Sequence, residues 1–337
     1  MVLAISAGVL LTTSFSFAIL ALLLRFANES KARRRLRLHK RWEPAILEIL
    51  GGAAPPEAIF DRVEDEDWQY FLDFLLAYAR RLRGEEQAMV RAMAAPYLPR
   101  VTPMLEAGTA ESRGNAVMML ASMGMPTYAD SVAGAPDDES SIVAMIAARS
   151  LFQPGHEEHF AAVLERLPRF TGWSRSFLAS MLAGGGPDAS PLMREIMRDT
   201  EERPLVRAVA CDALRELNDL AAVPVAIELL AVETDRELLA GCLRIVKQLG
   251  HQEHVAAVRG VASSRDSVIR ASAISALGAL GGRPEIPLLQ QRVDDPSFWV
   301  SLEAARGLLA LGDRATMERV AASDGPRSTL ARQVLAE

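Results

Sequence analysis

The stretch IRASAISALGALG (269–281) decides the fold, because three other stretches of the chain repeat its pattern. These are VRAVACDALRELN (206–218), LLAGCLRIVKQLG (238–250) and VSLEAARGLLALG (300–312). The closing leucines are Leu217, Leu249, Leu280 and Leu311, and their spacing is almost constant. Apolar residues recur at i, i+3, i+4 and i+7 in each stretch, so each is predicted to be a helix with one buried face.

Shorter apolar stretches lie between these helices, over residues 220–230, 253–262 and 284–293. Pro224 and Pro287 occupy the same place two repeats apart, and proline in a first turn marks a helix start. The repeating unit is therefore predicted to be two antiparallel helices in about 31 residues. Residues suited to a left-handed helix C-terminus close the longer helices: Asn218, Gly250, Gly281 and Gly312.

Weaker copies of the longer helix lie upstream, over residues 112–124, 141–152 and 173–185. They end at Met123, Leu151 and Leu182. Their partner helices are expected at 126–134, 157–167 and 188–198. The chain is thus predicted to hold seven repeats from about residue 97 to residue 312, with a partial repeat after them.

Two polar positions recur within the repeats. The first is an acidic residue in the turn before the longer helix, as Asp235 and Asp266. The second follows about one helical turn later and holds an arginine in three repeats, as Arg113, Arg207 and Arg270. With the Ala-rich stretch and the final Leu-Gly, this pattern resembles the HEAT-repeat family, in the short bacterial form also seen in bilin-lyase-like HEAT proteins. The resemblance covers about two thirds of the chain, and Gly172, Leu239 and Ser301 depart from it at the arginine position.

The resemblance implies an all-α fold, a right-handed α-solenoid of about seven to eight two-helix repeats, with the second helix of each repeat on the concave face. Arg113, Arg207 and Arg270 would then form a strip that binds a partner. The alternative is that these arginines tie one repeat to the next, and this is the favoured interpretation.

Residues 2–24 carry no charge and would span roughly 34 Å as a helix, enough for a hydrocarbon core of about 30 Å. No Lys or Arg precedes this stretch, which argues against a cleaved signal peptide. The eight Lys and Arg of residues 25–41 follow it, and such residues stay on the cytoplasmic side. We therefore expect a single-pass inner (cytoplasmic) membrane protein with its N-terminus outside and residues 25–337 in the cytoplasm.

The predicted domains are a transmembrane helix (1–24), a basic neck (25–41), a helical cap (42–96) and the repeats (97–337). The neck is either a topology signal alone or also a contact with anionic lipid. The residues expected at such a contact are Arg33, Arg34, Arg35, Arg37, Lys40 and Arg41. In the cap, the aromatic-rich helix expected over 65–84 either covers the end of the repeats or forms a docking surface.

Composition restricts the chemistry. Eight of the 37 basic residues but only one of the 43 acidic residues lie in residues 1–41, so 29 basic and 42 acidic residues remain for the body. That acidic excess, with 6% aromatic residues, argues against a nucleic-acid partner. The pairs His156/His159 and His251/His254 have i, i+3 spacing rather than that of HExxH, and Cys211 and Cys242 lie in Ala-rich helices. No metal, cofactor or catalytic residue is predicted.

These observations predict a membrane-anchored HEAT-repeat scaffold without catalysis of its own. It would contact the bilayer through residues 2–24 and bind a protein partner in or at the same membrane, at its cytoplasmic face. The alternative is a bilin-lyase-like or other HEAT-repeat enzyme, or a protein that handles a small molecule. A nucleic-acid binder is the least favoured.

Overall fold

The computed structural model describes residues 25, 29–30, 32–170 and 172–337. Every regular element in this part of the chain is helical, and it contains no β-strand. The chain divides into two compact units, Met1–Ala147 and Ala148–Glu337. The all-α prediction is therefore confirmed for the described residues.

The first unit begins with a helix over residues 32–50. Its further elements are η1 (Pro56–Arg62), η2 (Asp65–Asp67), α2 (Trp68–Ala79), α3 (Gly84–Ala94), η3 (Leu98–Arg100), η4 (Thr102–Leu105), α4 (Ala110–Met119), the π-helical η5 (Leu120–Gly124), α5 (Ala129–Ala133), η6 (Ala135–Asp137) and most of α6 (Ser141–Leu151). The fully buried Trp42 packs its ring against Phe71 and Phe74 of α2, with centroids 5.2 and 6.1 Å away. The aromatic face predicted for 65–84 is thus part of this unit's own core.

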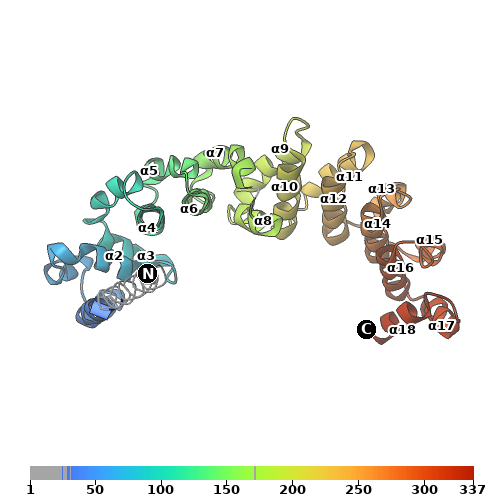
Figure 1. The fold of residues 1–337 in the computed structure, drawn as a ribbon, viewed down its shortest axis with the longest axis horizontal. Coiled ribbons are helices and arrows are strands. Elements are labelled where there is room, and N and C mark those ends of the chain that lie inside the picture. Colours follow the sequence, from blue (N-terminus) through green and yellow to red (C-terminus); the bar gives the residue numbers. More distant parts are fainter. Residues whose placement is uncertain (1–24, 26–28, 31, 171) are drawn as a thin grey trace, which may run out of the picture. The chain divides into compact units, whose positions relative to one another are not determined.

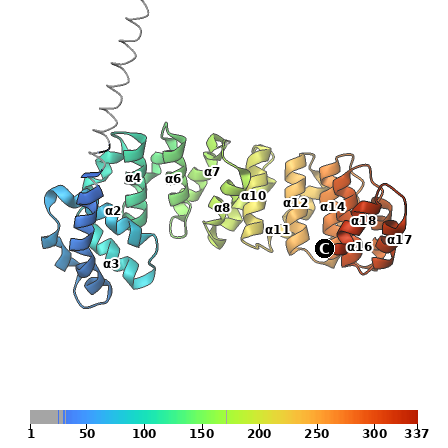
Figure 2. The same ribbon diagram turned by 60° about the horizontal axis from the view of Figure 1, so that its bottom comes forward.

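The second unit consists of paired helices. It contains η7 (Glu157–His159), α7 (Phe160–Glu165), η8 (Leu167–Phe170), α8 (Arg175–Ala183), η9 (Pro187–Ala189), α9 (Ser190–Arg198), α10 (Pro204–Glu216), α11 (Ala222–Val232), α12 (Arg236–Leu249), η10 (Gln252–His254), α13 (Val255–Val261), α14 (Ser267–Leu280), η11 (Arg283–Glu285), α15 (Ile286–Arg292), α16 (Phe298–Ala310), α17 (Arg314–Ala322) and α18 (Ser328–Ala336). The second helices α8, α10, α12, α14 and α16 pack side by side in chain order, as Figures 1 and 2 show. The first helices α9, α11 and α13 form the other layer.

Local sequence accounts for the helix starts and for the close packing. Asp235 and Asp266 are the N-caps of α12 and α14, where their carboxylates accept hydrogen bonds from backbone N–H groups of the first turn. Gly278 of α14 faces Gly307 of α16, and a Cβ at position 278 would lie 2.6 Å from the Gly307 Cα. Two glycines therefore permit the backbones of α14 and α16 to approach closely.

The predicted helix ends are only partly right. Asn218 and Gly312 adopt positive φ angles of 54° and 84°, as expected for a helix C-terminus. Gly250 and Gly281 instead adopt extended backbone, with φ angles of −76° and −75°. Sterics explain these two glycines, because a Cβ would collide with the carbonyl oxygen of Val246 or Leu277.

The predicted localisation requires a correction. Within the described residues, no helix is both long enough and apolar enough to cross a bilayer. α12 and α14, with 14 residues each, span about 21 Å against a hydrocarbon core of about 30 Å. The longer helix over residues 32–50 is rich in charged side chains. The finding conflicts with a single-pass membrane protein, and the span predicted for residues 2–24 lies outside the described residues.

Candidate functional site

The three arginines predicted from the repeat pattern have partners within their own unit. Each has little exposed side-chain surface, and each guanidinium pairs with a carboxylate that lies further along the chain, before the next second helix. The pairs are Arg113 with Asp138 (2.7 Å), Arg207 with Glu233 (2.8 Å) and Arg270 with Asp295 (2.9 Å). Ion pairs between successive repeats thus account for these side chains, and their role in partner binding stays a prediction.

The Arg270–Asp295 pair shows how such a tie is built. Arg270 donates from Nε and Nη2 to the two oxygens of Asp295, and from Nη1 to the carbonyl oxygens of Ser264 and Arg265. Burial alone would raise the pKa of the Asp295 carboxyl. The hydrogen bonds from Arg270 and the Ser297 N–H, with the charges of Arg270 and Arg292, outweigh burial and hold the pKa below its ordinary value. The pair is therefore ionised at neutral pH.

The acidic partners are not the acids that the repeat pattern singled out. Glu233 and Asp295 each lie two positions before the N-cap of a second helix, and each accepts a hydrogen bond from the N-cap N–H. Asp138 accepts in the same way from the Ser140 N–H. The available signal was a nearly constant spacing from arginine to acid, which crosses from one repeat to the next.

The basic residues predicted to contact lipid lie on the helix over residues 32–50. Arg34 pairs with the buried Asp67 at 2.6 Å, and Arg41 pairs with Glu64 at 2.6 Å. Arg33 pairs with Glu29 at 3.4 Å, while Arg35, Arg37 and Lys40 are exposed. Contacts inside the first unit thus involve part of this set, and its contact with lipid stays a prediction.

The histidine pairs and the cysteines form no evident chemical centre. In the described parts of the chain, no group of three or more His, Cys, Asp or Glu side chains is placed to hold a metal ion. His254 Nδ1 accepts a hydrogen bond from the His251 N–H, so this pair caps a helix start. Cys211 and Cys242 are fully buried, and their mutual hydrogen bond and burial raise the pKa of the Cys211 thiol well above its ordinary value. A protonated, inaccessible thiol is a poor nucleophile.

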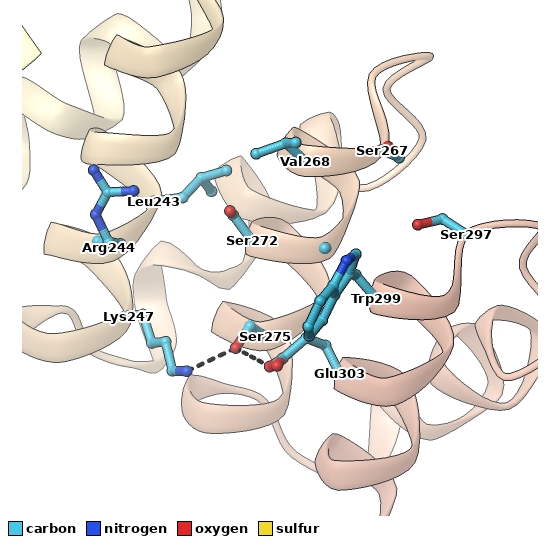
Figure 3. Close-up of a pocket in the computed structure, with 11 residues that line it drawn as sticks. Leu243, Arg244, Lys247, Ser267, Val268, Ser272, Ser275, Ser297, Trp299 and Glu303 are labelled. Atoms are coloured by element: carbon cyan, nitrogen blue, oxygen red, sulfur yellow. Dashed lines mark hydrogen bonds between the residues drawn. The ribbon is translucent and has the colours of Figure 1, made fainter. Parts of the chain in front are cut away.

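A hollow of about 310 Å³ lies on the second-helix layer of the second unit (Figure 3). α12, α14 and α16 form it, and we call it the second-helix groove. Its lining residues are Leu243, Arg244, Lys247, Ser267, Val268, Ala271, Ser272, Ser275, Ser297, Trp299 and Glu303. A neighbouring hollow of about 240 Å³ shares Lys247, Ser275 and Glu303 and continues to Arg306 and Ala310.

Side-chain size explains the groove. The central helix, α14, presents only the small side chains of Ala271, Ser272 and Ser275 at the floor. The flanking helices present long side chains, Arg244 and Lys247 from α12 on one side and Trp299 and Glu303 from α16 on the other (Figure 3). Trp299 is 66% exposed, which is unusual for the largest apolar side chain.

Polar side chains link the helices across the groove. Lys247 Nζ donates to Ser275 Oγ at 2.6 Å, and Ser275 Oγ donates to a carboxylate oxygen of Glu303 (Figure 3). Glu303 also lies 3.6 Å from Arg306, which binds Glu337 through two hydrogen bonds. The groove is thus held in shape by contacts from α12 to the C-terminal residue.

The same layer continues toward α8 with an ion-pair cluster. The carboxylate of Asp212 in α10 binds Arg175 at 2.8 Å and Arg244 at 3.0 Å. Arg175 also pairs with Glu237 of α12 at 2.6 Å. The second-helix layer thus carries charged side chains from α8 to α16.

Sequence reasoning missed this site because it followed the recurring acid and arginine near the start of each second helix. Apart from Ser267 and Ser297, the polar residues of the groove lie further along those helices than the recurring arginine position, as Arg244, Lys247, Ser272, Ser275 and Glu303, and Arg306 does so in the neighbouring hollow. Polar residues that recur in otherwise Ala-rich helices were a usable signal, since they mark the exposed face of each second helix.

Comparison with known proteins supports the repeat assignment for part of the chain. A family model described as HEAT repeats matches residues 223–310, a segment that includes α12, α14, α16 and nearly all of α11. No curated protein shows significant similarity to the chain.

Two solved structures illustrate the structural likeness. A crystal structure of Kap121p bound to Ste12p is 14% identical with a TM-score of 0.48, covering 81% of this chain and 37% of that chain. The complex of CpcE and CpcF of phycocyanin lyase from Nostoc sp. PCC7120 is 17% identical with a TM-score of 0.32, covering 71% of this chain and 86% of that chain. The chain thus spans less than two fifths of the Kap121p chain.

Proposed function

We propose that this chain is a scaffold of HEAT-like repeats that binds a protein partner in the second-helix groove and has no catalysis of its own. The observation that carries the proposal is the 66% exposure of Trp299 beside a hollow that spans three helices. A large apolar side chain left mostly in water contributes little to the stability of the free protein, whereas tryptophan at the centre of an interface contributes strongly to binding.

Neighbouring residues extend this apolar surface. Val268 at the start of α14 is 42% exposed, and Phe298 precedes Trp299 at the start of α16 and is also exposed. Polar side chains surround the apolar ones, as is typical of a protein interface with an apolar centre and a polar rim. The ion pairs of the rim fix the groove before a partner arrives, which lowers the entropic cost of binding.

The absence of catalysis is the second part of the proposal. The Cys211 thiol is buried and its pKa is raised. Among the described residues, Glu303 is the only acid that lines the second-helix groove. Its carboxylate contacts Ser275 and Arg306, and not a histidine or a second carboxylate that could share in acid–base catalysis. These groups are suited to fixing the helices in place.

Site-specific photo-crosslinking in the source cells tests the proposal. A photoreactive amino acid replaces Ser272 on the groove floor, or Gly260 in α13 on the first-helix layer. Gly260 is the matched control, because it is exposed and an added side chain there meets nothing within 4 Å. We expect a discrete protein adduct from position 272, which Trp299→Ala abolishes, and no such adduct from position 260.

Controls separate loss of binding from loss of fold. Each variant must give the same helical circular dichroism and melting temperature as the parent chain. Leu220→Ala, which removes another exposed apolar side chain just before α11, must leave the adduct at position 272 unchanged. No adduct at position 272, or the same adducts from both positions, would show that the groove is not the binding surface.

A further inference from the structure

We infer that the occupant of the second-helix groove is an extended, acidic peptide segment of the partner, with an apolar side chain placed on Trp299 and Val268. This inference rests on the proposed function and specifies the partner's chemistry. Three independent features of the groove lead to it: the exposure of its charges, its free hydroxyl groups and its apolar contacts.

The charges of the groove are unequally exposed. The side chains of Arg244 and Arg306 are 34% and 45% exposed, and Lys247 is exposed with no carboxylate within 4 Å among the described residues. Two carboxylates that pair with these arginines are more buried: the side chains of Asp212, beside Arg244, and Glu303, beside Arg306, are 10% and 25% exposed. The fold thus uses its acids to hold the helices and presents its bases to the groove.

Two exposed carboxylates border this surface, and both are already engaged. Glu237 pairs with Arg175 at 2.6 Å, and Glu337 pairs with Arg306 at 2.8 Å. A partner carboxylate therefore meets Lys247 first, because Arg244 is itself paired with Asp212. This preference is notable because the chain as a whole carries a formal net charge of −6.

The free hydroxyl groups favour an extended segment over a helix. Ser267, Ser272 and Ser297 line the groove, and in the described structure their hydroxyl groups make no hydrogen bond. An extended segment presents a backbone N–H and C=O at each residue, and hydroxyl groups can pair with both. A helix satisfies its own backbone groups and could pair with these hydroxyls only through its side chains.

The spacing of the helices sets the register of such a segment. Packed helices lie about 8–10 Å apart, and an extended segment of the polyproline II type advances about 3.1 Å per residue with three residues per turn, so it passes one helix about every three residues with the same face toward the groove. Val268 and Trp299 occupy the same position, the second residue of α14 and of α16. Apolar side chains of the segment are thus expected about three residues apart, with acidic residues on the side of Lys247.

Fluorescence anisotropy with the purified full-length chain tests the inference. The probe is a labelled synthetic peptide with two leucines about three residues apart and glutamates between and after them. Its counterparts carry lysine or glutamine in place of glutamate. We expect the acidic peptide to bind about 10-fold more tightly than the glutamine peptide at low salt, and the lysine peptide to bind most weakly.

Variants locate the charge effect. Lys247→Glu is expected to weaken binding of the acidic peptide by about 10-fold, and Lys247→Met by a smaller factor without adding a negative charge beside Glu303. Arg314→Glu makes the same charge change on the exposed surface of α17 and must leave binding within about twofold, as expected for a screened, distant charge. Trp299→Ala must weaken all three peptides alike.

A proline between the two leucines distinguishes the backbone conformations. An extended segment accepts proline, whereas a helix loses about 3 kcal/mol, or more than 100-fold in affinity. Retained binding supports the inference, and loss of binding in the proline peptide overturns it.

The remaining outcomes separate this inference from the proposed function. If Ser272 still crosslinks to a partner but Lys247→Glu and the peptide charges change nothing, the inference is wrong and the scaffold proposal stands. If no partner crosslinks at Ser272, the scaffold proposal fails first. A single-stranded oligonucleotide that competes with the acidic peptide at equal concentration would also overturn the inference, because the groove would then recognise negative charge alone.

Discussion

The repeats around α14 and α16 and those around α4 and α6 have similar length but different regularity. α14 and α16 are uninterrupted helices of 14 and 13 residues, and α14 starts at a carboxylate N-cap. α4 has 10 residues, starts at the neutral N-cap Thr109 and passes into the π-helical η5, and its partner α5 has only five residues. A period in the sequence thus indicates that repeats exist, whereas caps and small residues decide how regular each repeat becomes.

The largest expected difference concerns the ties between successive repeats. Arg270→Met would leave Asp295, whose side chain is 2% exposed, with Arg292 at 3.6 Å as its only charged partner among the described residues. We expect a loss of about 3 kcal/mol in the free energy of unfolding. Arg113→Met should cost less, because Asp138 is more exposed than Asp295 and the neighbouring Glu139 is well solvated.

Urea unfolding followed by circular dichroism measures both losses, and hydrogen exchange locates them. The exposed Arg314→Met on α17 is the control and should change stability little. The double variant Arg270→Met with Asp295→Leu should recover part of the loss, since it removes the isolated buried charge. Equal losses at positions 113 and 270 would contradict the difference in burial between the two regions.

The second difference concerns close packing at two helical glycines. Replacing one glycine with alanine is expected to lower the stability of the fold, and replacing the other is expected to raise it. Gly278→Ala places a Cβ 2.6 Å from the backbone of Gly307, so α14 and α16 must separate, at a cost of about 1–3 kcal/mol. Gly114 of α4 is the contrasting glycine, since a Cβ there would lie 3.5 Å from the end of the Ile146 side chain. Gly114→Ala should stabilise by about 0.5–1 kcal/mol, because alanine loses less backbone entropy in a helix.

Thermal melts of the two variants provide the measurement. Gly260→Ala in α13 is a useful third case, since an added Cβ there meets nothing within 4 Å. A Gly278→Ala variant that melts like the parent would mean that the helices can separate without loss.

These two predictions also indicate which features of the fold and of the groove could be predicted from the sequence. The repeat period, the apolar faces and the helix pairs could be predicted, because each follows from spacing along one chain segment. The Arg270–Asp295 tie could not be assigned, because the acid lies in the next repeat and Asp266 was closer to the expected turn position. The groove was missed because it depends on the relative size of side chains from three helices, α12, α14 and α16.

A third difference concerns how two carboxyl groups, Asp295 and Asp73, change the stability of the fold at low pH. Asp295 has a lowered folded pKa, so on acidification the unfolded state takes up the proton first and stability falls as pH drops below about 4. Burial raises the pKa of Asp73 in α2, against the opposing charges of Arg35 and His39. There the folded state takes up the proton first, so lowering the pH through the raised pKa adds stability.

Unfolding free energies measured between about pH 6 and pH 3 separate these contributions. Asp295→Asn should make the loss of stability in acid shallower than in the parent chain. Asp73→Asn should raise stability at neutral pH and remove the gain on acidification. Parallel profiles for the two variants would mean that the two carboxylates do not differ in their folded environments.

The smallest expected difference concerns the helix N-caps. The Asp266 carboxylate accepts hydrogen bonds from the N–H groups of Val268 (2.7 Å) and Ile269 (3.4 Å). Thr109 accepts one, from the Ser112 N–H at 3.2 Å, and has no charge to interact with the helix dipole. Asp266→Ala should therefore cost about 1 kcal/mol in the free energy of unfolding, and Thr109→Ala about half of that.

Asp266→Asn retains the hydrogen bonds and should recover most of the stability in urea unfolding. If Asp266→Asn is as damaging as Asp266→Ala, the charge rather than the hydrogen bonds fixes the start of α14, and added salt should then narrow the gap between Asp266 and Thr109.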